Sequence, residues 1–199
     1  MSGAAIDRGT ELGIMLANEE ISLAEQSADS NWPDRIHAVF KRHGVRQVGY
    51  VPDHGHMRLI ELCCADNEIT DVVLTTEAEG PALALGATLG GERAALMMQS
   101  SGVGNCVNAF SLLRNCAVPC VLLVTMRGEF NDFNPWQVPM GQITEPTLKL
   151  AGFLTYRVEQ EADVEPMVES ACRLAFGGGN LQIAVLLSQR MVDRSHQGH

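Results

Sequence analysis

The sequence predicts a three-layer α/β/α domain built on a parallel sheet of about six strands. Runs such as VVL, AALMM, CVLLVTM and IAVLL are apolar at consecutive positions, which is typical of strands buried on both faces. Segments with helical spacing alternate with these runs through short connections, as in sheets whose strands are joined by helical crossovers. The 199 residues, 46% of them hydrophobic, suffice for one sizeable core.

The expected elements follow one another from Trp32 onward. Helices are expected at Trp32–His43, Met57–Ala65, Glu77–Leu89, Asn105–Asn115, Pro146–Leu150 and Val164–Phe176. Strands are expected at Gln47–Val51, Asp71–Thr75, Ala94–Met98, Cys120–Met126, Leu154–Val158 and Gln182–Leu187. We therefore expect one domain at residues 31–194, an N-terminal arm at residues 1–30 with an amphipathic segment at Glu11–Ala24, and a C-terminal tail at residues 195–199.

Composition disfavours several classes of function. The formal charge is −10 and no basic cluster is present, so we expect neither a nucleic acid nor an anionic membrane as a partner. The six cysteines lie mostly in apolar runs and form no CxxC pair, which indicates free thiols in a reducing compartment. Without a charged-then-apolar leader or an apolar stretch of about 20 residues, the chain is expected to be soluble and cytoplasmic.

Ligands of such sheets bind outside the carboxyl ends of the strands, so the loops that follow strands are the candidate ligand-binding segments. Four of them are unusual in composition: Pro52–His56, Thr75–Glu77, Gln99–Asn105 and Arg127–Met140. We expect the functional site at this edge of the sheet.

Glu77 stands where a strand ends and a helix of small apolar residues begins. Thr76 and Glu79 have the spacing of a capping box, with Thr76 as N-cap and Glu79 reaching back to its backbone N–H, and both glutamates could serve only this helix start. A carboxyl in apolar surroundings has a raised pKa, whereas a helix N-terminus lowers it, so the net direction stays open. Along the same helix Ala82, Gly86 and Gly90 form a face nearly bare of side chains, against which a flat group or simply another helix would pack.

These residues resemble the pyrimidine-binding domain of thiamine-diphosphate-dependent enzymes. The resemblance rests on the strand before Glu77, on the small-residue helix with Gly86 and Gly90-Gly91, and on the segments MQSSGVGNCVNAFSLL and MRGEFNDFNPWQVPMG. Together they are similar to the alpha subunit of sulfopyruvate decarboxylases and to phosphonopyruvate decarboxylases, over roughly Trp32 to Val192.

The resemblance implies a reaction. In that family a glutamate, matched here by Glu77, hydrogen-bonds N1′ of the aminopyrimidine, and the cofactor accepts the electron pair released with carbon dioxide. It implies decarboxylation of a short anionic 2-oxo acid, sulfopyruvate giving sulfoacetaldehyde and carbon dioxide. Phosphonopyruvate or another 3-substituted pyruvate is the alternative substrate, and a non-catalytic cofactor-binding or regulatory module is the alternative class.

The resemblance also implies a partner chain. The family needs a second domain that grips the cofactor's diphosphate through Mg²⁺ and carries a GDG motif, and this sequence contains no GDG. We expect no metal ligands in this chain. A separate diphosphate-binding subunit would hold the Mg²⁺, in a hetero-oligomer with at least two copies of each chain.

The segment Ser100–Asn105 follows a strand and opens a helix, so its free backbone N–H groups could cradle an anion. The dinucleotide pattern GxGxxG fails because Val107 stands where its third glycine would be. An ordinary glycine-rich turn is the plainer interpretation. The resemblance instead assigns cofactor contacts to Pro52, Ser100, Ser101, Gly102 and Asn105.

Histidines and an arginine complete the predicted site. His54 and His56 could relay a proton or bind the acid's carboxylate, and they lack a third ligand for a metal. Arg127 suits a sulfonate, phosphonate or carboxylate through bidentate bonds, although an ion pair with Glu129 or Asp132 that orders the loop explains it equally well. Asp53 and Gln99 are the remaining predicted substrate contacts, and the long segment Asn131–Met140, with Phe133 and Trp136, is expected to be a lid or an interface loop.

Overall fold

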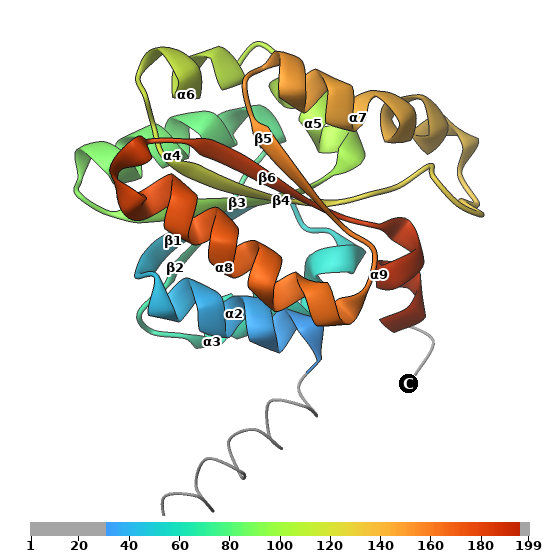
Figure 1. Ribbon diagram of the computed structural model, residues 1–199, viewed down its shortest axis with the longest axis horizontal. Coiled ribbons are helices and arrows are strands. Elements are labelled where there is room, and N and C mark those ends of the chain that lie inside the picture. The colour runs from blue at the N-terminus through green and yellow to red at the C-terminus, as the bar shows by residue number, and fades with distance from the viewer. Residues whose placement is uncertain (1–30, 196–199) are drawn as a thin grey trace, which may run out of the picture. The chain divides into compact units, whose positions relative to one another are not determined.

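A computed structural model of the chain describes residues 31–195. It has a central sheet between two layers of helices, as predicted (Figure 1). The predicted N-terminal arm, its amphipathic segment and residues 196–199 lie outside the described residues. Among residues 31–195, no helix combines the length and apolar character needed to cross a membrane.

Helices and strands alternate along the chain. The strands are β1 Val45–Tyr50, β2 Thr70–Val73, β3 Arg93–Gln99, β4 Cys120–Thr125, β5 Leu154–Val158 and β6 Gln182–Leu187. The α-helices are α2 Trp32–Arg42, α3 Met57–Ala65, α4 Gly80–Leu89, α5 Ser100–Cys106, α6 Phe110–Asn115, α7 Val138–Leu150, α8 Val164–Leu174 and α9 Gln189–Ser195. Short 3₁₀ turns at His54–His56, Glu77–Glu79, Pro135–Gln137 and Glu161–Asp163 precede helices, and Ala175–Gly179 forms a wider turn after α8.

All strand pairs are parallel, and the strand order is β2-β1-β3-β4-β6-β5. Strand β1 therefore lies inside the sheet, and from it the chain moves outward to β2 and crosses back to β3, so the connections diverge between β1 and β3. The register pairs Tyr50 with Met97 and Gln99 with Thr125. This register brings the carboxyl ends of β1, β3 and β4 together, where a ligand site is expected.

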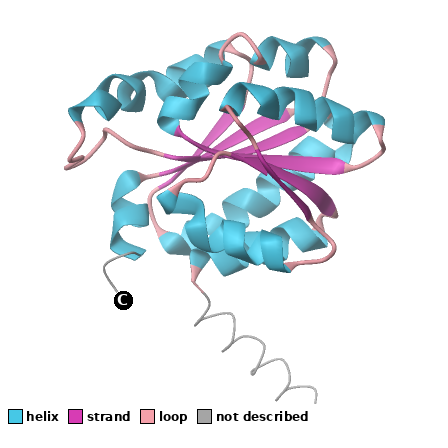
Figure 2. Cartoon of the chain, turned by 180° about the vertical axis from the view of Figure 1, so that it is seen from behind, coloured by secondary structure: helices cyan, strands magenta, loops and turns pink. Residues whose placement is uncertain are grey.

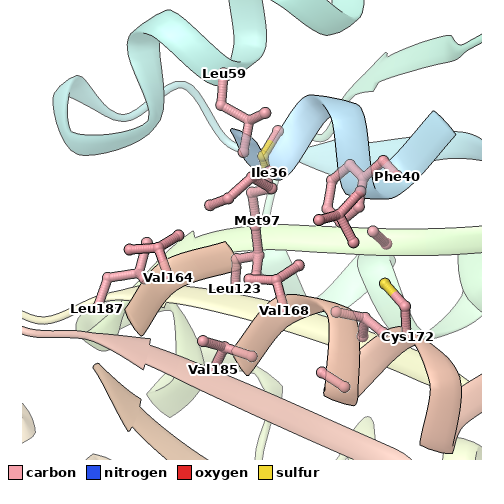
Figure 3. Packing of buried hydrophobic residues seen from close by; sticks show 14 of the residues in the cluster. Ile36, Phe40, Leu59, Met97, Leu123, Val164, Val168, Cys172, Val185 and Leu187 are labelled. Carbon is pink, nitrogen blue, oxygen red and sulfur yellow. The ribbon is translucent and has the colours of Figure 1, made fainter. Parts of the chain in front are cut away.

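The two helix layers bury separate apolar cores on the two faces of the sheet. Helices α2, α3 and α8 cover one face, and α4 to α7 cover the other (Figures 1 and 2). On the first face Ile36 and Phe40 of α2 and Val168 of α8 pack against Met97 and Leu123 of the sheet (Figure 3). Each fully buried side chain of this kind contributes about 1.5–3 kcal/mol relative to leaving it in water, so the sheet is a rigid base for the loops at its edge.

Two helices differ from the predictions. The expected helix Asn105–Asn115 is two helices, and the first, α5, begins directly at the end of β3, so the glycine-rich segment is helical and not a loop. Helix α7 begins well before the predicted Pro146–Leu150. Proline is tolerated in the first helical turn, which Pro139 occupies, whereas Pro146 lies inside the helix and was wrongly taken as its start.

All six cysteines are free thiols, but only Cys64 and Cys116 are exposed. Burial raises the pKa of the other four thiols, Cys63, Cys106, Cys120 and Cys172, to about 12. Because the thiolate is the reactive form, we expect two thiols to react with a thiol reagent in the native chain at pH 8, and six after unfolding in urea. Mass spectrometry of the labelled peptides checks this, and rapid native labelling of Cys120 would contradict it.

Candidate active site

Asp53 joins the ends of three strands. It follows β1, and its Oδ1 accepts a hydrogen bond of 2.6 Å from Gln99 Nε2 at the end of β3. Its Oδ2 accepts one of 2.6 Å from Thr125 Oγ1 at the end of β4. The predicted substrate residues Asp53 and Gln99 therefore lie together, bonded to each other.

The Asp53 side chain is only 5% exposed. Burial acts to raise the pKa of this carboxyl, but contacts with His56, Thr125 and Gln99 outweigh burial and hold the pKa well below its usual range. Asp53 is therefore an anion at neutral pH, and its charge lies beneath the surface of the site.

Glu77 follows β2 and lies across the start of α5. Its carboxylate rests on Gly102, where a methyl group would come within 2.6 Å of Glu77 Cγ and 2.8 Å of Oε1. Asn105 Nδ2 donates a 2.9 Å hydrogen bond to Glu77 Oε2. Glycine is thus required at position 102 by close approach, and three residues predicted to contact the cofactor form one cluster.

The predicted capping box before α4 is wrong in detail. Thr76 makes no side-chain cap, and Glu79 Oε2 accepts a 2.9 Å hydrogen bond from the backbone N–H of Thr75, not of Thr76. Glu79 therefore serves the turn, while the half-buried Glu77 points to α5.

Ser100 fastens α5 to its neighbours. Its hydroxyl is fully buried and accepts a 3.2 Å hydrogen bond from the backbone N–H of Arg127, after β4. Its carbonyl accepts a 3.3 Å hydrogen bond from Thr144 Oγ1 of α7. The half-buried Ser101 and the exposed Pro52 have their side chains closer to solvent. Cofactor contacts by these three residues stay predictions.

Asp132 organises the loop after β4. Arg127 donates two hydrogen bonds of 2.8 Å to its two carboxylate oxygens, and its guanidinium lies 5.2 Å from the centre of the Phe133 ring. The Asp132 carboxylate also accepts from the backbone N–H groups of Gly128 and Asn134 and from Gln189 Nε2. The ion pair expected as an alternative for Arg127 is therefore present with Asp132.

A pocket of about 140 Å³ opens between the ends of β1 and β4 and helix α9. Its lining consists of Asp53, His54, Gly55, Thr125, Met126, Arg127, Asn131, Phe133, Gln189 and Val192. The two predicted histidines differ in their position relative to this pocket. His54 is exposed and lines the pocket, whereas His56 is 1% exposed and does not line it. Among residues 31–195, no three histidine, cysteine or acidic side chains gather as a metal site requires.

No protein-family model matches the chain. The alpha subunit of sulfopyruvate decarboxylase from Methanothermobacter thermautotrophicus is 34% identical over 118 residues, which cover 59% of this chain and 72% of that subunit. The chain belongs to the sulfopyruvate decarboxylase alpha-subunit family. Phosphonopyruvate decarboxylase from Streptomyces viridochromogenes is 32% identical over 75% of this chain but only 38% of its own length.

A solved structure shares the fold. The 2-oxoglutarate:ferredoxin oxidoreductase of Magnetococcus marinus superposes with a TM-score of 0.61 over 80% of this chain and 29% of its own, at 11% identity. At this identity the likeness extends to the fold alone, and it agrees with the predicted three-layer architecture.

Sequence reasoning missed part of the candidate site in this member of the sulfopyruvate decarboxylase alpha-subunit family. Helix α9, which supplies Gln189 and Val192 to the pocket, was not expected. The sequence does carry a signal for this helix, because serine, a favoured N-cap residue, stands at position 188 directly before it. In the structure Ser188 Oγ accepts a hydrogen bond of 3.3 Å from the backbone N–H of Met191, as an N-cap does. Thr125 was missed because it ends a run of apolar residues and was read as part of the core.

Proposed function

We propose that this chain is the pyrimidine-binding subunit of a two-chain, thiamine-diphosphate-dependent decarboxylase that converts sulfopyruvate to sulfoacetaldehyde and carbon dioxide. The observation that carries the proposal is the Glu77 carboxylate, laid over Gly102 and held by Asn105 at the carboxyl edge of the sheet. Membership of the sulfopyruvate decarboxylase alpha-subunit family supports the choice of substrate.

The residues around Glu77 fit the aminopyrimidine of this cofactor. Glu77 Oε2 accepts a hydrogen bond from Asn105, while Glu77 Oε1 accepts none from the described residues. The exposed residues Ala82 and Gly86 leave the neighbouring helix α4 flat, and a methyl group at position 86 would have nothing within 4 Å. A ring nitrogen that shares a proton needs a carboxyl oxygen of this kind, and a planar ring needs open space.

We assign a task to each residue of this cluster. Thiamine diphosphate, when bound, supplies the electron sink for the pair released with carbon dioxide. Glu77 would hold a proton at Oε1 and share it with the pyrimidine N1′. Asn105 would fix the rotation of the carboxylate through Oε2, and Gly102 would allow its close approach to α5.

The substrate would enter from the pocket beside Asp53. His54 would act as a proton donor or as a ligand of the acid's carboxylate, because its imidazole is exposed there. Gln99 would contribute by orienting Asp53, to which it donates a hydrogen bond. Arg127 would contribute positive charge to the wall of the pocket while Asp132 fixes its orientation.

The second chain would complete the site. It would carry the GDG motif, hold Mg²⁺ and grip the diphosphate, in an assembly with at least two copies of each chain. The S. viridochromogenes relative supports this, since 62% of its length lies outside the match, given that the match covers 38%. The M. thermautotrophicus relative supports it as well, because that protein is itself named as a subunit.

The test is co-expression of the full chain with a candidate diphosphate-binding subunit, followed by carbon dioxide release from a panel of 2-oxo acids. We expect the highest kcat/KM with sulfopyruvate and none without added thiamine diphosphate and Mg²⁺. Preference for phosphonopyruvate would support the alternative that the S. viridochromogenes relative suggests. Cofactor binding by the complex without turnover of any acid would favour a non-catalytic module.

Gly102→Ala tests the position of Glu77 without changing its chemistry. The added methyl group would meet the carboxylate at 2.8 Å, so the side chain must move, and we expect kcat/KM to fall about 100-fold. Gly177→Ala is the matched control, because a methyl group there meets nothing within 4 Å and the turn lies at the opposite edge of the sheet. Equal activity of the two variants would count against the assignment of Glu77.

A further inference from the structure

His56 is a buried imidazole without a hydrogen-bond partner. It ends the turn His54–His56 and is 1% exposed. Neither Nδ1 nor Nε2 has a hydrogen-bond partner among residues 31–195. Burying a polar group costs free energy unless a hydrogen bond or an ion pair compensates, so the groups around this ring indicate which interaction it makes.

The group in reach is the Asp53 carboxylate. His56 Nδ1 lies 3.4 Å from Asp53 Oδ2, within ion-pair distance but outside hydrogen-bond geometry. Within the described part of the chain, Asp53 is the one acid in ion-pair range of His56. An ionised carboxylate only accepts, so the nitrogen that faces it carries the proton, and a small rotation of the ring would complete the bond.

The local backbone fixes which histidine faces inward. Gly55 separates the two, and a methyl group at position 55 would come within 2.7 Å of Thr125 Cγ2 and 3.2 Å of Asp53 Oδ2. The turn therefore lies directly on the Asp53–Thr125 hydrogen bond. This contact leaves His54 in the wall of the pocket and His56 beneath it.

We propose that His56 is a positioning residue that acts through Asp53. Its Nδ1–H, together with Gln99 and Thr125, would hold the Asp53 carboxylate in one orientation at the floor of the pocket. The Asp53 oxygens have room for this third donor, since a carboxylate offers about four acceptor sites. This inference rests on the proposed function, because it assigns Asp53 to the substrate side of that site.

A double-mutant cycle in the two-chain complex tests the proposal, with kcat and KM for sulfopyruvate as the readout. We expect His56→Leu to lower kcat/KM about tenfold or more, as for the loss of a hydrogen bond to a charged group. In an Asp53→Asn background the same change should lower it less than about twofold, because contacting residues are not additive. His56→Asn keeps an N–H donor near the position of Nδ1 and should recover most of the loss.

His43→Leu is the matched control. Its Nε2 contacts Glu169 at 2.6 Å, and His43 lies before β1, at the opposite edge of the sheet from the pocket. This variant should keep the wild-type kcat/KM even where it lowers the melting temperature. If His56→Leu costs as much in the Asp53→Asn background as in the wild type, or if His56→Asn is as poor as His56→Leu, the proposal is wrong.

Unfolding of the same four full-length chains in urea separates this inference from the proposed function. A wild-type complex inactive with every acid would overturn the proposed function. Coupling between positions 53 and 56 in the unfolding midpoints would still support the contact between them. Additive midpoints would overturn the contact itself.

Discussion

Glu77→Gln is expected to abolish most of the decarboxylase activity while leaving the fold and the assembly unchanged. Glutamine has nearly the same shape and can still accept the hydrogen bond from Asn105, but it cannot hold the proton that we assign to Oε1. Loss of a positioned acid–base group costs about 10²–10⁴-fold in rate. Carbon dioxide release by the complex measures the loss, and proton exchange at C2 of the bound cofactor should slow in parallel.

Glu79→Gln is the control for this experiment. Glu79 is the exposed neighbour whose carboxylate accepts from the backbone of Thr75, and its change should leave kcat/KM unaltered. Turnover of the Glu77→Gln complex at the wild-type rate would show that Glu77 has no part in the chemistry.

Asp132→Ala is expected to cause the largest loss of stability. The side chain is 2% exposed and accepts from Arg127, from two backbone N–H groups and from Gln189, all of which would lose their acceptor. Breaking a buried pair costs about 3–5 kcal/mol, and the partial exposure of Arg127 reduces this to about 2–4 kcal/mol. Urea unfolding of the full chain measures the loss, and Asp132→Asn, which keeps one oxygen, should lose less.

Acid should reveal the same interaction. The hydrogen bonds from Arg127 outweigh burial and hold the pKa of Asp132 well below its usual range. The folded pKa is therefore below the unfolded pKa of about 4, so the stabilisation is complete above pH 4 and is lost as the pH falls further. The unfolding free energy of the Asp132→Ala chain should fall less steeply with acid than that of the wild type, and equal slopes would contradict this.

Local sequence pattern was sufficient for the sheet but not for every helix. Strands β5 and β6 have the predicted bounds, and for β6 the reason is a short apolar run that follows a glycine-rich turn. The start of α5 was missed because glycine and serine are poor helix formers. There tertiary contacts outweigh propensity, since Gly102 and Gly104 are packed against Glu77 and Met140.

The position of the candidate site in the fold could be predicted from the sequence, but the hydrogen bonds within it could not. The carboxyl ends of parallel strands share one edge, which sufficed to expect Glu77, Asp53 and Arg127 there. Thr125, which donates a hydrogen bond to Asp53, lies 72 residues away and meets it through the registers of β1 with β3 and of β3 with β4. No local pattern of residues carries that information.

The start of helix α5 contacts both Asp53 and Glu77, the two carboxylates of the candidate site. Gln99, the N-cap of α5, donates a hydrogen bond to Asp53. Gly102, in the first turn of α5, lies in close contact with the Glu77 side chain. These two positions are separated by about 4.5 Å along the axis of an α-helix. The positions of Asp53 and Glu77 therefore both depend on where α5 begins. A shift in the start of α5 would therefore displace both carboxylates at once.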